Sequence, residues 1–96
     1  MNSIIKEKVP VTEMLAGLAE ECSELAQAAL KLRRALDQTN PTPVTQDEAF
    51  EKLCEEVADV KLYIYLLSLP NSHITMIMGQ KLKRWEDRLN GKIKTL

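Results

Sequence analysis

Acidic residues in two separate segments of the chain have the spacing that gathers carboxylates on one face of a helix. Glu20, Glu21 and Glu24 lie in the first segment, and Glu56 and Asp59 lie in the second. Residues three or four apart are neighbours on a helix surface, so each group presents its carboxylates on one side. Both groups flank the apolar residues of their own segments. If the two helices pack antiparallel, the acidic groups can face each other at the rim of the core.

Facing carboxylates need a positive partner. Two like charges about 4 Å apart repel by roughly 4 kcal/mol at an effective dielectric constant of about 20. A divalent cation offsets this repulsion, and a donor set of carboxylate oxygens alone suits Mg²⁺ or Mn²⁺ better than zinc or copper. A di-iron bundle is not favoured, because neither segment carries a Glu-x-x-His pair. Since Mg²⁺ usually shares its coordination sphere with substrate phosphates, the acidic groups indicate a phosphate-bearing substrate.

A basic stripe toward the C-terminal end is a candidate for holding that phosphate. Its residues recur at helical spacing: Lys81, Arg84 and Arg88. Lys and Arg also favour the C-terminal ends of helices for electrostatic reasons alone, so an ordinary solvated helix end is the alternative interpretation. Three further substrate contacts are predicted: Lys31 for a phosphate, and Tyr63 and Trp85 for stacking on a base. Inward aromatic residues at helical spacing are nevertheless core residues more often than ligand contacts.

The apolar pattern predicts the first of three helices that would position these residues. It begins with Thr12 as its N-cap and runs for about 25 residues. Its inward line alternates steps of three and four: Leu15, Leu18, Cys22, Leu25, Ala29, Leu32 and Leu36. Residues 37–44 contain Pro41 and Pro43, which cannot continue the helix, so this segment is predicted to be a mobile loop.

The second predicted helix opens on a capping box formed by Thr45 and Glu48. Its inward line has the same alternation: Phe50, Leu53, Val57, Val60, Ile64 and Leu67. Residues 60–69 are apolar on nearly every side of the helix. Because a helix that is apolar all round must be covered all round, this run is predicted to lie at a subunit interface.

The third predicted helix starts after Pro70, with Asn71 or Ser72 as its N-cap, and ends near Asn90 and Gly91. Its predicted inward residues are Ile74, Met78, Leu82, Trp85 and Leu89. Together the three helices predict one all-α domain over residues 1–96. A chain of 96 residues buries only a marginal core by itself, so a helical bundle completed by a second copy is expected.

Composition excludes several classes of protein. With 13 Lys and Arg against 14 Asp and Glu, the net charge of −1 does not favour nucleic-acid binding, which depends on neutralising phosphates. The longest apolar run, residues 62–69, is far shorter than the roughly 20 residues of a membrane span. The N-terminus has no signal-peptide core. Cys22 and Cys54 lack CxxC spacing and are predicted to be reduced core thiols of a cytoplasmic protein.

The two acidic motifs in this order resemble those of a known family. Residues 20–24, EECSE, and residues 56–59, EVAD, are similar to the EExxE and ExxD motifs of the MazG-like nucleoside triphosphate pyrophosphohydrolases. The resemblance covers roughly residues 12–90. The chain departs from the family pattern in a slightly longer separation between Glu24 and Glu56. It also lacks the Asn that often accompanies the basic residues of the third helix.

The resemblance implies an all-α, MazG-like helical bundle that is completed as a dimer or a dimer of dimers. It implies Mg²⁺, or Mn²⁺, as cofactor, held by Glu21, Glu24, Glu56 and Asp59, with Glu20 as an additional acid of the motif. It further implies hydrolysis of a nucleoside triphosphate between the α- and β-phosphates, which gives a nucleoside monophosphate and pyrophosphate. Glu20 or Glu24, where not fully used in ligation, would orient the attacking water or accept its proton.

Two other functions remain open at this point. In the first, the protein is a non-catalytic helical dimer that serves as an interaction module, and its acidic residues form a solvated surface. In the second, the fold is the same but the substrate is phosphoribosyl-ATP. Neither alternative includes a nucleic acid or a membrane as partner.

Overall fold

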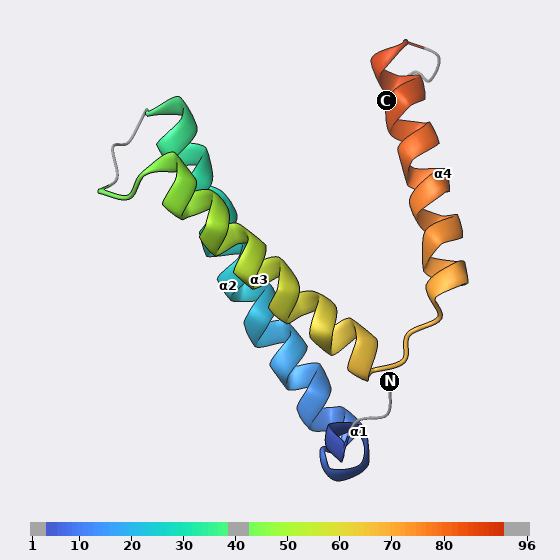
Figure 1. Ribbon diagram of the computed structural model, residues 1–96. Helices are drawn as coiled ribbons and strands as arrows, with labels where there is room; N and C mark the ends of the chain where they lie inside the picture. The colour runs from blue at the N-terminus through green and yellow to red at the C-terminus, as the bar shows by residue number, and fades with distance from the viewer. Residues whose placement is uncertain (1–3, 39–42, 92–96) are drawn as a thin grey trace.

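The computed structural model describes residues 4–38 and 43–91, and every regular element within these ranges is an α-helix (Figure 1). The elements are α1 (Ile4–Lys8), α2 (Val11–Asp37), α3 (Gln46–Leu66) and α4 (Asn71–Leu89). The all-α prediction is therefore confirmed, and α2, α3 and α4 correspond to the three predicted helices. None of these helices combines the length and the apolar character that crossing a membrane would require.

Helix α3 begins where the capping box predicts. The Thr45 hydroxyl accepts a hydrogen bond from the Glu48 N–H at 3.1 Å, and the Glu48 carboxylate accepts one from the Thr45 N–H at 3.3 Å. Helix α2 ends one residue before Gln38, which adopts a left-handed conformation with φ 56°. The predicted mobility of the 37–44 loop concerns mainly residues 39–42, which lie outside the described residues.

Prolines, and not polar side chains, precede the other two long helices. Pro10 and Pro70 are extended, neither helix has a side-chain cap, and each proline carbonyl accepts the first helical hydrogen bond. The predicted N-caps Thr12, Asn71 and Ser72 are therefore wrong, because each of these residues already lies inside its helix. Proline's fixed φ interrupts the preceding segment and lets a helix start directly after it.

Helices α2 and α3 lie antiparallel and pack along most of their length (Figure 1). The buried residues of this contact are Met14, Ala28 and Ala35 on α2 and Ala49, Glu56 and Leu66 on α3. Half-buried residues alternate with them: Leu18, Leu25 and Leu32 on α2, and Leu53, Val60 and Leu67 at α3. We call this line of contact the seam. Its small alanines allow the two helix axes to approach closely.

The seam differs from the predicted inward lines by one residue at every second position. The residues predicted to be inward but found exposed are Leu15, Cys22, Ala29 and Leu36 on α2 and Phe50, Val57 and Ile64 on α3. In each case the preceding residue faces the seam, so that Glu21 and Glu56 lie inside and Cys22 and Val57 outside. Both lines have the same alternation of steps because they share the same half-buried residues. Periodicity alone therefore cannot distinguish them.

The two cysteines lie outside the seam as well. Cys22 and Cys54 are free and exposed, so the prediction of core thiols is wrong. Cys22 directly follows Glu21, which takes the inward place that the spacing assigned to the thiol. Cys54 directly follows the seam residue Leu53 and is likewise exposed.

Gly17 allows the closest approach within the seam. A Cβ at this position would lie 2.5 Å from Cε1, Cζ and Oη of Tyr63. The ring of Tyr63 therefore packs directly on the backbone of α2, in space that only glycine leaves open. Tyr63 is half-buried by this contact.

Helix α4 runs away from the α2–α3 pair after the turn at residues 67–70 (Figure 1). Ser68 gives this turn a left-handed residue with φ 54°. None of the residues of α4 is buried, and Trp85 and Leu89 are 64% and 77% exposed. The prediction that α4 turns its apolar residues inward is therefore wrong within one chain. An amphipathic pattern shows that a face needs cover, but it does not identify the surface that covers it.

Helix α1 is an additional element that joins the start of the chain to the same turn. The Lys6 ammonium donates a hydrogen bond to the Ser68 hydroxyl at 2.8 Å. The same ammonium lies 4.8 Å from the centre of the Tyr65 ring, a cation–π distance. These contacts hold α1 beside the end of α3.

Candidate functional site

Three carboxylates converge across the seam. Glu21 and Glu24 of α2 and Glu56 of α3 each offer an oxygen, and these oxygens lie within 4.8 Å of one another. Glu24 is exposed, Glu21 is half-buried, and Glu56 is only 4% exposed. We call these three residues the acidic trio. Its members come from both helices, so their approach depends on the packing of α2 against α3.

The register of the seam explains why the trio forms. Glu21 stands between Leu18 and Leu25 on α2, and Glu56 stands between Leu53 and Val60 on α3. Each therefore takes a position that an apolar residue would fill in a simple helical hairpin. Polar groups in such positions cost free energy unless a partner satisfies them.

The trio is only partly satisfied by the protein itself. Among the described residues, the Oε2 atoms of Glu21 and Glu56 are buried and have no hydrogen-bond partner. The other oxygen of Glu56, Oε1, pairs with the Lys52 ammonium at 3.0 Å. Buried polar atoms without partners are rare in folded proteins, and one way in which proteins satisfy such atoms is to bind an ion.

The pKa values of the site show the same excess of negative charge. Burial, followed by hydrogen bonding to Glu24, raises the pKa of the Glu21 carboxyl above its ordinary 4.5. The negative charges of Glu24, Asp59 and Glu56 raise the pKa of Glu21 further. The hydrogen bond and the charge of Glu56 raise the pKa of the Lys52 ammonium above 10.5. An added cation would stabilise the ionised form of every carboxyl here.

These residues fit a divalent cation. The donors are all carboxylate oxygens, which Mg²⁺ and Mn²⁺ prefer, and two of them are buried without a partner. The unpartnered oxygens belong to Glu21 and Glu56, on opposite sides of the seam. A cation between the helices would therefore satisfy atoms of both.

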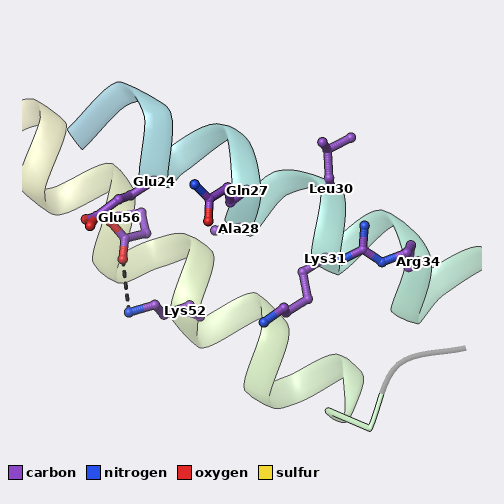
Figure 2. Close-up of a pocket in the computed structure, with 8 residues that line it drawn as sticks. All are labelled: Glu24, Gln27, Ala28, Leu30, Lys31, Arg34, Lys52 and Glu56. Atoms are coloured by element: carbon purple, nitrogen blue, oxygen red, sulfur yellow. Dashed lines mark ion pairs between the residues drawn. The ribbon is translucent and has the colours of Figure 1, made fainter. Parts of the chain in front are cut away.

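A groove of about 370 Å³ opens beside the trio (Figure 2). Its lining residues are Glu24, Gln27, Ala28, Leu30, Lys31, Arg34, Lys52 and Glu56. Figure 2 shows the carboxylates of Glu24 and Glu56 together at one end, with Lys31 and Arg34 farther along α2 and Lys52 on α3. The volume lies within the range of small-molecule sites, roughly 300–1,000 Å³. The groove thus has an acidic end and a basic side.

Among the predicted acidic site residues, the catalytic candidate Glu20 and the metal ligand Asp59 lie outside the trio. Both are exposed, Glu20 on α2 and Asp59 on α3. Asp59 is nevertheless close enough for its charge to act on Glu21. The structure therefore brings together Glu21, Glu24 and Glu56, with Asp59 at the edge of the same cluster.

Of the predicted substrate contacts, Lys31 lines the groove and the others do not. Tyr63 packs on Gly17 in the seam. The remaining four residues are exposed on α4, apart from the groove: Lys81, Arg84, Trp85 and Arg88. Within one chain, the basic stripe of α4 and the acidic trio are not parts of one site.

Arg34 and Lys52 are the charged groove residues that the sequence pattern did not single out. Arg34 follows Lys31 by three residues, so the two share a face of α2. Lys52 precedes Glu56 by four residues, the spacing of a helical ion pair. Both spacings were visible in the sequence, but only the register of the seam shows that the two pairs border one groove.

The arrangement can bind a divalent cation and an anion side by side, and a metal-bound polyphosphate offers both charges in one ligand. The chain was compared with protein-family models, with curated proteins and with solved structures. None of these three comparisons gives a match.

Proposed function

We propose that this protein is a metal-dependent nucleoside triphosphate pyrophosphohydrolase, which cleaves between the α- and β-phosphates to release a nucleoside monophosphate and pyrophosphate. The observation that carries the proposal is the acidic trio, with its unpartnered buried oxygens, at one end of a groove that three basic residues border. The resemblance of the EExxE and ExxD motifs to the MazG-like family agrees with this assignment.

The residues divide into roles according to their position. The trio would hold Mg²⁺ or Mn²⁺, which when bound neutralises phosphate charge and makes water more acidic. Lys31, Arg34 and Lys52 would bind phosphate oxygens along the groove. Glu24 is the exposed member of the trio, so its carboxylate is the best placed to accept a proton from the attacking water.

Glu20 is the weaker candidate for that role in the structure. It is exposed and lies outside both the trio and the groove lining. Asp59, which acts on Glu21 through its charge, would join the trio as a fourth ligand. The core of the proposed metal site is nevertheless the trio, because its members come from both helices and include the two unpartnered buried oxygens, those of Glu21 and Glu56.

The proposal includes self-association as a homodimer or homotetramer. The seven exposed residues displaced from the seam form what we call the outer stripe: Leu15, Cys22, Ala29, Leu36, Phe50, Val57 and Ile64. Each lies one residue after a seam residue, whereas Glu24, Lys31 and Lys52 each lie one residue before one. In an antiparallel helix pair these two sets fall on opposite sides of the seam. A second copy could therefore cover the outer stripe and leave the groove open.

Pyrophosphate release is the measurement that tests the activity. The full chain is incubated with canonical and oxidised nucleoside and deoxynucleoside triphosphates, with and without Mg²⁺. We expect metal-dependent release from at least one of them, and a loss of at least about a hundredfold in Glu56→Gln. Glu51→Gln, which removes an exposed carboxylate from the same helix, is the matched control. Absence of release from every substrate, or equal rates in both variants, would contradict the proposal.

Adding phosphoribosyl-ATP to the substrates, and measuring the melting temperature with and without Mg²⁺, separates the alternatives. Release from phosphoribosyl-ATP alone would favour the related activity on the same fold. A non-catalytic interaction module would release nothing, and Mg²⁺ would not raise its melting temperature. A metal-binding protein gains about 2.7 kcal/mol at a metal concentration one hundred times Kd, and this gain corresponds to roughly 10–20 °C in a domain of this size.

A further inference from the structure

Lys52 lies between the acidic end and the basic side of the groove. Its ammonium lies 3.0 Å from Oε1 of Glu56 and 3.8 Å from Oε2 of Glu55. The side chain of Glu56 is 5% exposed, whereas that of Lys52 is 58% exposed. The lysine therefore reaches from solvent to a carboxylate that is otherwise almost closed off. Figure 2 shows it on the α3 side of the groove, opposite the stretch of α2 that carries Lys31.

The ion pair with Lys52 conflicts with a metal at the same carboxylate. A divalent cation bound to Glu56 would place at least two further positive charges within a few ångströms of the Lys52 ammonium. Like charges about 4 Å apart repel by several kcal/mol at the dielectric constants of partly buried sites. Lys52 thus neutralises Glu56 where no metal is bound, and a metal and this ammonium compete for the same carboxylate, the ammonium at Oε1 and the metal at the unpartnered Oε2.

Once displaced from Glu56, the Lys52 side chain can move toward Lys31 and Arg34. Lys31 and Arg34 line the same groove, and neither forms an ion pair within residues 4–38 and 43–91. Lysine has a flexible four-carbon stem with a rotatable ammonium, and most of this stem is exposed here. After displacement from Glu56, three cations would border the groove, and the only carboxylate left in an ion pair with Lys52 among the described residues would be the exposed Glu55, so the groove would be a stronger anion site.

We propose that Lys52 is an exchangeable counter-ion: it pairs with Glu56 in the metal-free protein, and metal binding at the acidic trio releases it to bind phosphate beside Lys31 and Arg34. This inference rests on the proposed function, because it assumes that the trio takes a divalent cation. It makes metal binding and polyphosphate binding mutually favourable, and by linkage each strengthens the other equally.

Binding measurements on the full chain test the exchange without relying on turnover. Mn²⁺ alone and inorganic pyrophosphate with saturating Mn²⁺ are titrated into the wild type and Lys52→Gln by calorimetry. We expect Lys52→Gln to bind Mn²⁺ several-fold more tightly, because its internal competitor is gone, and to bind pyrophosphate about tenfold more weakly. Lys61→Gln makes the same change of charge on α3 outside the groove, and both of its affinities should stay within about twofold of wild type.

The proposal requires the two affinities of Lys52→Gln to change in opposite directions, tighter for Mn²⁺ and weaker for pyrophosphate. A variant that loses both affinities has suffered structural damage, and one with unchanged Mn²⁺ affinity shows that Lys52 does not compete with metal; either result overturns the exchange. A direct readout is the Lys52 ammonium resonance in ¹⁵N-labelled protein, which should lose its ion-paired shift on titration with the diamagnetic Mg²⁺. Failure of the wild type to bind any divalent cation would overturn the proposed function as well, so the two failures are distinguishable.

Discussion

The residues on the two sides of the α2–α3 seam are each only one sequence position away from a seam residue, before it on one side and after it on the other. Residues one position before the seam include Glu24, Lys31 and Lys52, which line the groove. Residues one position after it form the outer stripe, where Leu15 and Phe50 are 50% and 58% exposed. One helical hairpin therefore has a charged side suited to chemistry and an apolar side suited to a partner. The comparison teaches that the register of the seam decides which residues form the charged side and which form the apolar side; under the proposed function, these are the catalytic side and the side that assembles.

The largest effect is expected on the charged side. Glu24→Gln removes the exposed carboxylate of the trio, and we expect pyrophosphate release to fall by at least about a hundredfold. Because Glu24 lies at the edge of the seam, helical circular dichroism should be unchanged. Unchanged turnover in this variant, with Glu51→Gln as control, would remove Glu24 from the mechanism.

On the apolar side, a charge should break assembly and spare metal binding. Ile64→Lys places an ammonium in the middle of the outer stripe, where the wild-type side chain is 38% exposed. If a second copy covers this stripe, an unpaired buried charge should weaken association by about a hundredfold or more. Light scattering at micromolar concentration measures it, with the exposed Glu51→Lys as control. A wild type that is strictly monomeric at this concentration would refute the outer stripe as an interface.

A single added methyl group should have opposite effects at Gly17, in the seam, and at Gly79, on α4. Gly17→Ala forces a Cβ to 2.5 Å from the Tyr63 ring, so we expect a net destabilisation of about 1 kcal/mol after the gain in helix propensity. At Gly79 nothing lies within 4 Å of the added Cβ, and Gly79→Ala should stabilise α4 by up to about 1 kcal/mol. Urea denaturation measures both.

A second variant makes the Gly17 test independent of helix propensity. In a Tyr63→Ala background the obstructing ring is gone, so adding Gly17→Ala should now stabilise the protein. If Gly17→Ala has the same effect in both backgrounds, the ring of Tyr63 does not pack on α2 as described.

The smallest expected effect is on the pH dependence of the metal-free protein. Burial and the neighbouring acids Glu24, Asp59 and Glu56 raise the pKa of Glu21 in the folded state, so its protonated form is favoured by folding. Its contribution to stability is therefore present at low pH and is lost as pH rises through the raised pKa. Stability should increase as pH is lowered from 7 toward 4.5, the ordinary value for this carboxyl.

The Glu21→Gln variant should lack this increase, because it cannot titrate. The urea midpoint at several pH values gives the result, and equal slopes in the two proteins would contradict the assignment. Saturating Mg²⁺ should reverse the slope in the wild type, since protons then compete with the metal.

The helices were predictable from the sequence, but the seam was not. The prolines at 10 and 70 and the capping box at Thr45 punctuate the chain, and the alternation of threes and fours identifies the helices between them. That alternation fits two adjacent lines equally well. Packing selects the line with the small residues Ala28 and Ala49. The spacing of apolar residues does not reveal this choice, because it is the same for both lines.

The candidate site was also predictable only in part: its acidic residues could be predicted from the sequence, but most of its basic residues could not. The motif spacing identifies the acidic residues, and Glu21, Glu24 and Glu56 do converge. Lys31 was predicted as a phosphate contact and lines the groove, but the other basic partners were assigned to α4, because Lys81, Arg84 and Arg88 form the more conspicuous stripe. The groove instead contains Arg34 and Lys52, whose places follow from the register between two helices and not from either helix alone.

The separation of α4 from the hairpin has a kinetic consequence. Helices α2 and α3 are neighbours in the chain, so they can dock by closing one short loop, which is a fast unimolecular event. The apolar face of α4 has no such local partner, and in a homo-oligomer it is covered only when two chains meet. We therefore expect the amide hydrogens of α4 to exchange faster as the protein is diluted, while those of the hairpin keep their protection.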